Sequence, residues 1–186
     1  LRDGSEIEPL QLEDIDEAIE LFKNENVEAI SICFMNAFAN PQHEHEAAER
    51  VRRALPDAYL TVSTDLLAAI RFYERISTTA LNSYVGPILN HYLEQLTGRL
   101  EKDGFGGLLL IMQSNGGVMP FKAAVAGAKT VHTLFSGPAA GAQAAAYLAA
   151  EDAKKGLVTL DMGGTSCDIA FIEGGTPLEV TEGEVA

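Results

Sequence analysis

The chain has 186 residues, of which 47% are hydrophobic and 22% are charged, a composition typical of globular proteins. Its formal net charge of −14 argues against binding to nucleic acid or to anionic membrane surfaces, because both attract basic protein surfaces. The two cysteines show neither zinc-site spacing nor a disulfide framework, and no run of about 20 apolar residues occurs, so we expect a cytoplasmic protein with reduced thiols.

The first part of the chain alternates predicted helices with predicted strands. Apolar spacing predicts a helix over residues 11–24, a buried strand over 27–34, a helix over 43–55 and a strand over 59–63. This order predicts a parallel β-α-β unit with helices on the faces of its sheet.

A long helix is predicted over residues 77–102, after a helix or turn over 65–73. Its apolar side is expected to include Ile88, Tyr92, Leu93, Leu96 and Leu100. The alternating charges of Arg71, Glu74 and Arg75 before this helix are most simply interpreted as an ion pair within one helix.

Histidines and carboxylates cluster at the start of the second predicted helix, as His43, Glu44, His45 and Glu46. Residues two apart on a helix do not share a face, so a two-histidine metal site is geometrically poor here. We expect His43 to make a capping or packing contact instead.

The second part of the chain begins with a predicted buried strand over residues 108–112, followed by a polar loop. Ligand-binding loops of open α/β sheets lie at the carboxyl ends of strands, so this loop is a candidate for a substrate or cofactor cleft. The cleft candidates are Gln113, Ser114, Asn115, Gly116 and Gly117. The alternative is a simple strand-to-helix turn built from Asn-Gly-Gly.

Three elements are predicted between this loop and the last part of the chain. A helix is expected over residues 121–126, and a short strand or extended loop over 131–135. Ser136 is then expected to cap a helix that starts near Pro138 and runs to about Ala150.

One face of this last helix is nearly bare, because Gly137, Gly141 and Ala145 recur every four residues. Such a face permits close backbone approach, either in a helix that connects two domains or in a tightly packed core helix. Ser136 and Gly137, at the start of the helix, are added to the cleft candidates. The charged residues 151–155 are predicted to form a linker.

The octapeptide Asp-Met-Gly-Gly-Thr-Ser-Cys-Asp over residues 161–168 is the strongest functional signal. It lies between apolar runs over 156–160 and 169–172, which predict the strands of a hairpin. Its glycines are expected to adopt positive φ and to leave room for a ligand, while successive backbone N–H groups form an anion site. Asp161 and Asp168 flank the turn and have the oxygen ligands that Mg²⁺ prefers.

A phosphate and metal site is therefore predicted at this turn. Asp161 is the catalytic candidate and the candidate Mg²⁺ ligand, and it would bind the ion or orient a water. The cofactor-binding candidates are Gly163, Gly164, Thr165, Ser166 and Asp168. The alternative is a plain β-hairpin, since Gly-Gly turns are common.

Residues 160–170 resemble the second phosphate loop of the actin, hexokinase and heat-shock chaperone ATPase superfamily. More narrowly, they resemble the hydantoinase A/5-oxoprolinase family, which also contains N-methylhydantoinases and acetone carboxylase subunits. Further stretches that match this family are Asn40-Pro41 with His43-Glu44, residues 72–75, residues 77–79, residues 112–117 and residues 136–142. The resemblance also raises the alternative that Arg75 supports a site or a domain interface.

This resemblance implies an α/β fold that is part of an actin-like ATPase, in which two RNase H-like lobes enclose a nucleotide. The first phosphate loop and the adenosine-binding segment of that superfamily do not appear in the sequence. We therefore expect an internal part of a larger protein, with residues 1–150 as the C-terminal part of the first lobe and residues 151–186 as the start of the second.

The resemblance further implies an ATP-dependent hydrolase that opens cyclic amides of the hydantoin or 5-oxoproline type, with ATP and Mg²⁺ as cofactors. Its expected partners are the nucleotide, a small cyclic amide, the remainder of a larger chain and a second subunit. The alternatives are a subunit of an ATP-dependent acetone or acetophenone carboxylase, a small-molecule kinase, and a non-enzymatic interaction module switched by nucleotide.

Overall fold

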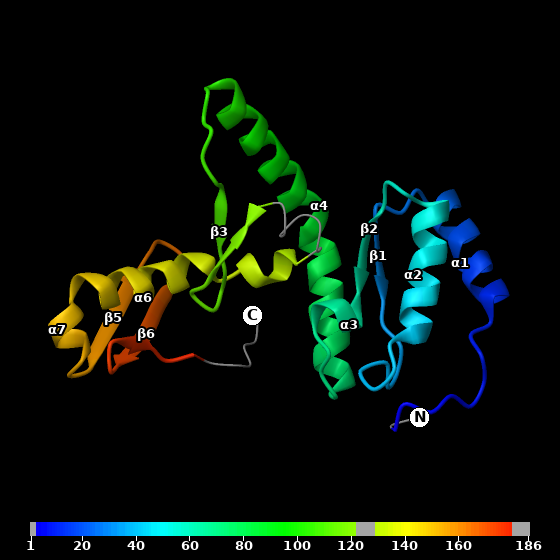
Figure 1. Ribbon diagram of the computed structural model, residues 1–186, viewed down its shortest axis with the longest axis horizontal. Coiled ribbons are helices and arrows are strands. Elements are labelled where there is room, and N and C mark those ends of the chain that lie inside the picture. Colours follow the sequence, from blue (N-terminus) through cyan, green and yellow to red (C-terminus); the bar gives the residue numbers. More distant parts are fainter. Residues whose placement is uncertain (1–2, 122–128, 180–186) are drawn as a thin grey trace. The chain divides into compact units, whose positions relative to one another are not determined.

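The computed structural model describes residues 3–121 and 129–179 (Figure 1). The chain divides into two compact units, the first formed by Leu1–Gly107 with Lys122–Val131 and the second by Leu108–Phe121 with His132–Ala186. The units have separate sheets and separate apolar clusters. None of the described helices is long and apolar enough to span a membrane. The expected division of a larger protein into two lobes near residue 150 stays a prediction.

The first unit is built on a two-stranded parallel sheet. Its strands β1 (Ala29–Ile32) and β2 (Tyr59–Val62) pair in register along their whole length. The helix α2 (Gln42–Ala54) connects the strands, and α1 (Leu12–Asn24) precedes them. The predicted parallel β-α-β unit and both of its helices are therefore confirmed, with β1 shorter than expected.

An apolar cluster joins α1, α2 and the sheet of the first unit, as the amphipathic spacing of the two helices predicts. Ala47 and Ala48 are almost completely buried on α2, and their short side chains allow the helix to approach the strands closely. The buried members of the cluster are Ile19, Ile30, Ile32, Ala47, Ala48, Val51 and Val62.

The short helix α3 (Ser63–Leu66) and the long helix α4 (Phe72–Lys102) follow β2. α4 was expected to bury an apolar side, but Ile88 and Tyr92 are 71% and 58% exposed. The residues that α4 does bury are mostly polar or small: Arg75, Thr79, Asn82, Ser83, Gly86 and Leu93. The prediction of an apolar stripe is therefore wrong for these two residues.

Hydrogen bonds replace apolar packing where α4 meets the sheet. The hydroxyl of Thr61 on β2 accepts hydrogen bonds from Asn82 Nδ2 at 3.0 Å and from Ser83 Oγ at 2.9 Å. Ser31 Oγ on β1 donates to Ser83 Oγ at 2.8 Å. A buried polar group without a partner is costly, so this interface is stable only while these bonds are paired.

A buried ion pair joins α2 to the first turn of α4. Glu44 and Arg75 are each 0% exposed, with Arg75 Nη1 lying 3.5 Å from Glu44 Oε1. Glu44 also accepts hydrogen bonds from the backbone N–H of Phe34, from Ser63 Oγ, and from the backbone N–H and hydroxyl of Thr64. Arg75 Nη2 donates to the carbonyl of Phe34 at 2.6 Å. The backbone of Phe34 is thus bonded to side chains, which explains why β1 ends before this residue.

The sequence interpretation of the nearby charges is confirmed only in part. Arg71 and Glu74 form the expected pair within one helical segment, at 3.4 Å. Arg75 does not take part in that pair, because its guanidinium is turned into the protein toward Glu44. His43 Nε2 lies 3.3 Å from Glu6 Oε2 and His45 Nε2 lies 3.0 Å from Asp65 Oδ1, so each histidine has a carboxylate partner where a capping or packing contact was expected for His43.

The second unit contains a small hairpin, a helix and a three-stranded antiparallel sheet. β3 (Leu110–Met112) pairs with β4 (Val118–Pro120) in an antiparallel register. The 3₁₀ turn η1 (Thr130–Thr133) leads toward α6 (Ser136–Leu148), which is followed by α7 (Ala150–Ala153). The sheet consists of β5 (Leu157–Met162), β6 (Cys167–Glu173) and β7 (Thr176–Pro177).

Several local expectations for this part of the chain need correction. Residues 130–133 form a 3₁₀ turn where a strand or extended loop was expected. Ser136 is the first residue of α6 and makes no capping bond, because the position before the helix belongs to Phe135. The charged segment expected as a linker begins with α7. Most of the helix expected over residues 121–126 lies outside the described residues.

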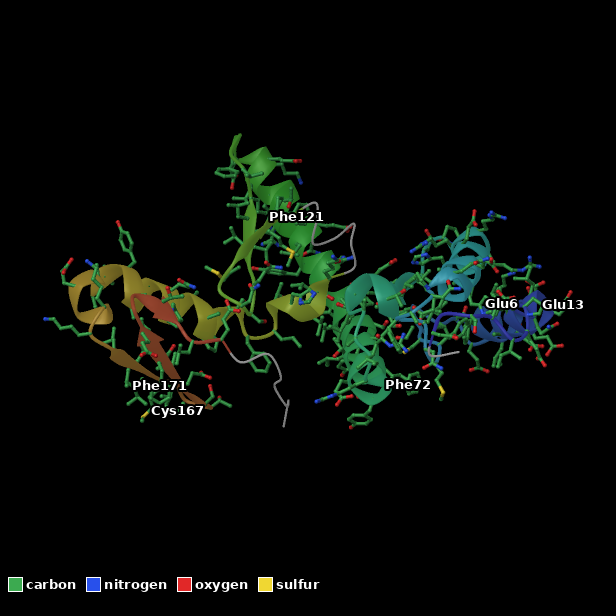
Figure 2. The ribbon with its side chains drawn as sticks, turned by 60° about the horizontal axis from the view of Figure 1, so that its bottom comes forward. Glu6, Glu13, Phe72, Phe121, Cys167 and Phe171 are labelled. Carbon is green, nitrogen blue, oxygen red and sulfur yellow. The ribbon has the colours of Figure 1, made fainter. Side chains whose placement is uncertain are left out.

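The β5–β6 hairpin, which was predicted, has two different faces. Side chains alternate along paired strands, so one set of residues, including Leu157 and Ile172, packs toward α6. Phe171 and Cys167 lie on the side away from α6 (Figure 2). The exposed apolar residues of the two strands are Val158, Leu160, Met162, Ile169 and Phe171.

We predict that Arg75→Met strongly destabilises the first unit. The substitution leaves the Glu44 carboxylate buried without its cation, and the loss of one partner of such a pair costs about 3–5 kcal/mol. The free energy of unfolding from urea denaturation measures this loss. Arg53→Met is the matched control, because it removes the exposed pair with Glu49 and should cost less than about 1 kcal/mol. Equal losses in the two variants would contradict a special role of the buried pair.

We also predict opposite effects for two Gly→Ala substitutions within α4. A Cβ on Gly86 would lie 2.1 Å from Tyr59 Cζ, so Gly86→Ala should destabilise the protein by about 1–3 kcal/mol through overpacking. No atom lies within 4 Å of a Cβ on Gly98, so Gly98→Ala should stabilise it by up to about 1 kcal/mol. Thermal unfolding of both variants measures the difference, and a stabilising Gly86→Ala would refute the close packing of Tyr59.

Candidate functional site

A cavity of about 990 Å³ lies within the second unit. Four segments line it: the β3–β4 turn, the helix α6 with the residues just before it, the β5–β6 hairpin, and residues 177–179 at the end of β7 and just after it. Six of the residues predicted from sequence are brought together around it: Gln113, Ser114, Asn115, Gly116, Asp161 and Asp168. The other candidates do not line this cavity: Gly117, Ser136, Gly137, Gly163, Gly164, Thr165 and Ser166.

Two carboxylates face each other across the β5–β6 hairpin. Asp161 and Asp168 are directly opposite in the strand register, so both side chains lie on the face that lines the cavity. Ser166 Oγ donates to Asp168 Oδ2 at 3.2 Å, and neither carboxylate has an ion-pair partner among the described residues. Like charges placed opposite each other in a sheet repel, and a cation between them would relieve this repulsion.

The chemistry of this pair fits Mg²⁺ better than a metal held by protein ligands alone. Within residues 3–121 and 129–179, no group of three or more His, Cys, Asp or Glu side chains could hold a metal ion. Mg²⁺ commonly binds one or two carboxylates and completes its shell with water and substrate phosphates. Asp161 and Asp168 offer carboxylates of the type that Mg²⁺ takes as ligands.

The turn between the two strands is tighter than expected. The strands extend to Met162 and Cys167, so the two aspartates lie on strands and only four residues form the turn. The N–H of Gly163 donates to the carbonyl of Ser166 at 3.0 Å. Neither Gly163 nor Gly164 adopts positive φ, which corrects the expectation from the sequence.

Gly164 leaves open space beside the turn. No atom lies within 4 Å of the position that a Cβ on Gly164 would occupy. Within the described residues, no intramolecular hydrogen bond uses the backbone N–H of Gly164 or Thr165. Exposed N–H groups without partners in a turn are suitable donors for an anion.

The β3–β4 turn is held against the segment that precedes α6. Ser114 donates to the carbonyl of His132 through its backbone N–H at 2.6 Å and through its hydroxyl at 2.8 Å. The Ser114 hydroxyl also accepts a hydrogen bond from the N–H of Phe135 at 3.0 Å. The role of Ser114 in this geometry is to position the turn.

The place of residues 113–117 in the fold differs from the one expected from the sequence. β3 is antiparallel to β4, so residues 113–117 form a hairpin turn and do not lie at the carboxyl edge of a parallel sheet. Gly116 has φ of 78°, which explains a glycine at that position of the turn. The turn lines the cavity because it is bonded to the segment before α6.

The bare face of α6 allows close approach to the hairpin at one glycine. A Cβ on Gly141 would lie 3.7 Å from Asp161 Oδ2, whereas a Cβ on Gly137 would have no atom within 4 Å. Sequence reasoning did not identify His132 or Gln143, which also line the cavity. His132 contributes a backbone carbonyl bond that no residue pattern reveals, and Gln143 stands alone among small residues of α6.

Two models of one protein family match nearly the whole chain. Residues 75–186 match the family model described as Hydantoinase/oxoprolinase. Residues 1–55 match the model of the Hydantoinase/oxoprolinase N-terminal region.

A curated relative and two solved structures are similar to the chain. The alpha subunit of caprolactamase from Pseudomonas jessenii is 37% identical over 175 residues, which cover 94% of this chain and 25% of the relative. The crystal structure of the ATP-dependent caprolactamase from Pseudomonas jessenii aligns with a TM-score of 0.77 at 35% identity, over 91% of this chain and 24% of that one. The nucleotide-free structure of acetone carboxylase aligns with a TM-score of 0.77 at 24% identity, over 94% and 25%.

These alignments confirm the predicted fold class, an α/β fold that is part of an ATPase-like architecture. The chain spans about a quarter of the length of the proteins that it matches.

We predict that Gly116→Ala destabilises the second unit. A non-glycine residue at φ of 78° costs about 1–2 kcal/mol, and the added Cβ would lie 2.5 Å from Gln143 Nε2. Gly137→Ala serves as the control, because its Cβ would meet no atom within 4 Å and alanine favours a helix. Urea unfolding of both variants measures the effect, and a Gly116→Ala protein as stable as the parent would exclude this conformation of the turn.

Proposed function

The chain belongs to the hydantoinase/oxoprolinase family, and on this basis we propose that its protein is an ATP-dependent hydrolase of a cyclic amide of the hydantoin or 5-oxoproline type. The observation that supports this proposal most directly is the carboxylate pair Asp161 and Asp168 on the wall of the 990 Å³ cavity, beside a turn with open N–H groups. The relative that is 37% identical is named a caprolactamase, and caprolactam is also a cyclic amide.

The residues at the hairpin fit a magnesium nucleotide. The turn offers backbone N–H groups and the hydroxyl of Thr165, which are hydrogen-bond donors for phosphate oxygens. The facing carboxylates offer oxygen ligands for Mg²⁺. When bound, MgATP would supply a phosphoryl group that activates the amide oxygen of the substrate, because amide resonance otherwise makes ring opening slow.

The chain's own residues have distinct roles in this proposal. Gly164 and Thr165 hold phosphate oxygens through their backbone N–H groups and the Thr165 hydroxyl, whereas the N–H of Gly163 is already bonded to the carbonyl of Ser166. Asp161 holds the Mg²⁺ ion or orients the attacking water, and it is the catalytic residue that we propose. Asp168 supports the turn through its bond from Ser166. Phosphoryl chemistry depends mainly on positioning and charge neutralisation, which such groups provide.

A second candidate function is a subunit of an ATP-dependent ketone carboxylase. The observation that favours it is the equal TM-score of 0.77 with acetone carboxylase, at the lower identity of 24%. The same carboxylate pair and turn would serve a carboxylase, because both activities use a nucleotide.

Phosphate release from MgATP by the full-length protein distinguishes these functions. The assay compares cyclic amides (5-oxoproline, hydantoin and ε-caprolactam) with acetone or acetophenone plus bicarbonate. Stimulation by a cyclic amide alone supports the hydrolase. Stimulation only by a ketone with bicarbonate supports the carboxylase, and stimulation by none of these compounds contradicts both.

We predict that Asp161→Asn lowers kcat for amide-stimulated ATP hydrolysis by at least about 100-fold, because it removes one charge that the reacting groups require. Glu173→Gln is the control: it removes one carboxylate charge from the same hairpin, at an exposed position of β6 outside the cavity. That control should retain the parent's rate within a factor of about two. Unchanged turnover and nucleotide affinity of Asp161→Asn would refute the assigned role.

A further inference from the structure

Three carboxamide side chains line the cavity of the second unit, and they differ in what they bind. Asn115 Oδ1 accepts a hydrogen bond from the N–H of Gly117 at 2.9 Å. Gln113 Nε2 contacts Met119 Sδ at 3.8 Å. The carboxamide of Gln143 makes no hydrogen bond with any residue that the structure describes. Gln143 therefore has both a donor and an acceptor for a ligand in the cavity.

The side chain of Gln143 lies next to the β3–β4 turn. It lies in the middle of α6 and is half-buried. Its side chain packs against Gly116, where an added Cβ would lie 2.5 Å from Nε2 and 3.1 Å from Cγ. The glycine at positive φ thus leaves the space that this carboxamide occupies.

The amide of a small ring has a geometry that matches a carboxamide. Open-chain secondary amides are trans and direct their N–H and C=O to opposite sides. Ring closure forces the cis form, in which N–H and C=O point to the same side. A primary carboxamide has an oxygen and a syn N–H in the same spacing, so the two groups form a pair of parallel hydrogen bonds.

We propose that Gln143 is a substrate-binding residue that recognises the cis-amide edge of a cyclic amide. Its Oε1 accepts the ring N–H and its Nε2 donates to the ring carbonyl. This inference rests on the proposed hydrolase function and adds the group that selects cyclic amides over open-chain amides. A site that hydrogen-bonds a substrate discriminates against analogues that lack the partner group, because its polar groups then lose that bond when the analogue covers them.

The test compares two ligands and two variants in the full-length protein. The ligands are ε-caprolactam and its N-methyl derivative, which retains the ring and the carbonyl but has no N–H. Gln143→Leu removes both hydrogen-bonding groups with little change in size. Gln95→Leu is the control, because it makes the same chemical change at an exposed glutamine of α4 outside the cavity. Isothermal titration calorimetry gives Kd, and phosphate release from MgATP gives kcat and KM.

The expected result is a loss of discrimination by Gln143→Leu. Its Kd for ε-caprolactam should rise by about 10–100-fold, while its Kd for the N-methyl compound changes by less than about three-fold. Gln95→Leu should keep the parent's ratio of the two constants. Equal weakening of both ligands, no weakening of either, or no binding of either to the parent protein would each overturn the inference.

The two readouts separate this inference from the proposed function. Binding of ε-caprolactam that depends on Gln143, without ATP hydrolysis stimulated by ε-caprolactam, 5-oxoproline or hydantoin, would support the recognition site and contradict the hydrolase. Stimulated hydrolysis with a ratio of constants that is unchanged by Gln143→Leu would support the hydrolase and overturn the recognition site.

Discussion

The first unit depends on one buried ion pair, Glu44 with Arg75. Both side chains are fully removed from solvent, and charges in such surroundings are stable only when they are paired and hydrogen-bonded. Glu44 meets this requirement by accepting bonds from the residues that follow β1 and β2, while Arg75 donates to the first of these segments. Four segments that are far apart in the sequence are thus fixed by one pair of side chains. Arg75 is therefore part of the core of the first unit and not of a helical surface pair.

Beyond the ion pair, buried hydrogen bonds also hold α4 against the sheet. Thr79, Asn82 and Ser83 are buried at helical spacing after Arg75, and their bonds to the sheet are directional. Apolar packing tolerates small sliding movements, but a network of buried hydrogen bonds is satisfied in one register only. The polar character of the buried face also explains why the apolar pattern of the sequence predicted the buried side of α4 only in part. A periodicity of polar residues carries no hydrophobic signal, so apolar residues such as Ile88 were expected inside although they are exposed.

The sequence was sufficient for many of the local elements, and it selected six residues that line the cavity. Short apolar runs predicted the strands of the β-α-β unit and of the β5–β6 hairpin, although most residues of the hairpin strands are exposed. The octapeptide predicted Asp161 and Asp168, which do line the cavity, but their direct opposition depends on strand register. β4 was too short to leave a pattern. Gln143 lies outside every motif, and only the structure brings it next to Gly116, a turn residue 27 positions earlier in the sequence.

The cavity combines two kinds of polar group, which limits the ligands that it suits. Carboxylates only accept hydrogen bonds, so the hairpin side requires a cation or a donor before an anionic phosphate can approach. The carboxamide of Gln143 is neutral and offers one donor and one acceptor together, which suits a neutral ligand with both functions. A cyclic amide has both, whereas a ketone has a carbonyl acceptor and no N–H. A ketone would offer no N–H to Oε1 of Gln143, so the recognition that we propose for this residue applies to the hydrolase and not to the carboxylase.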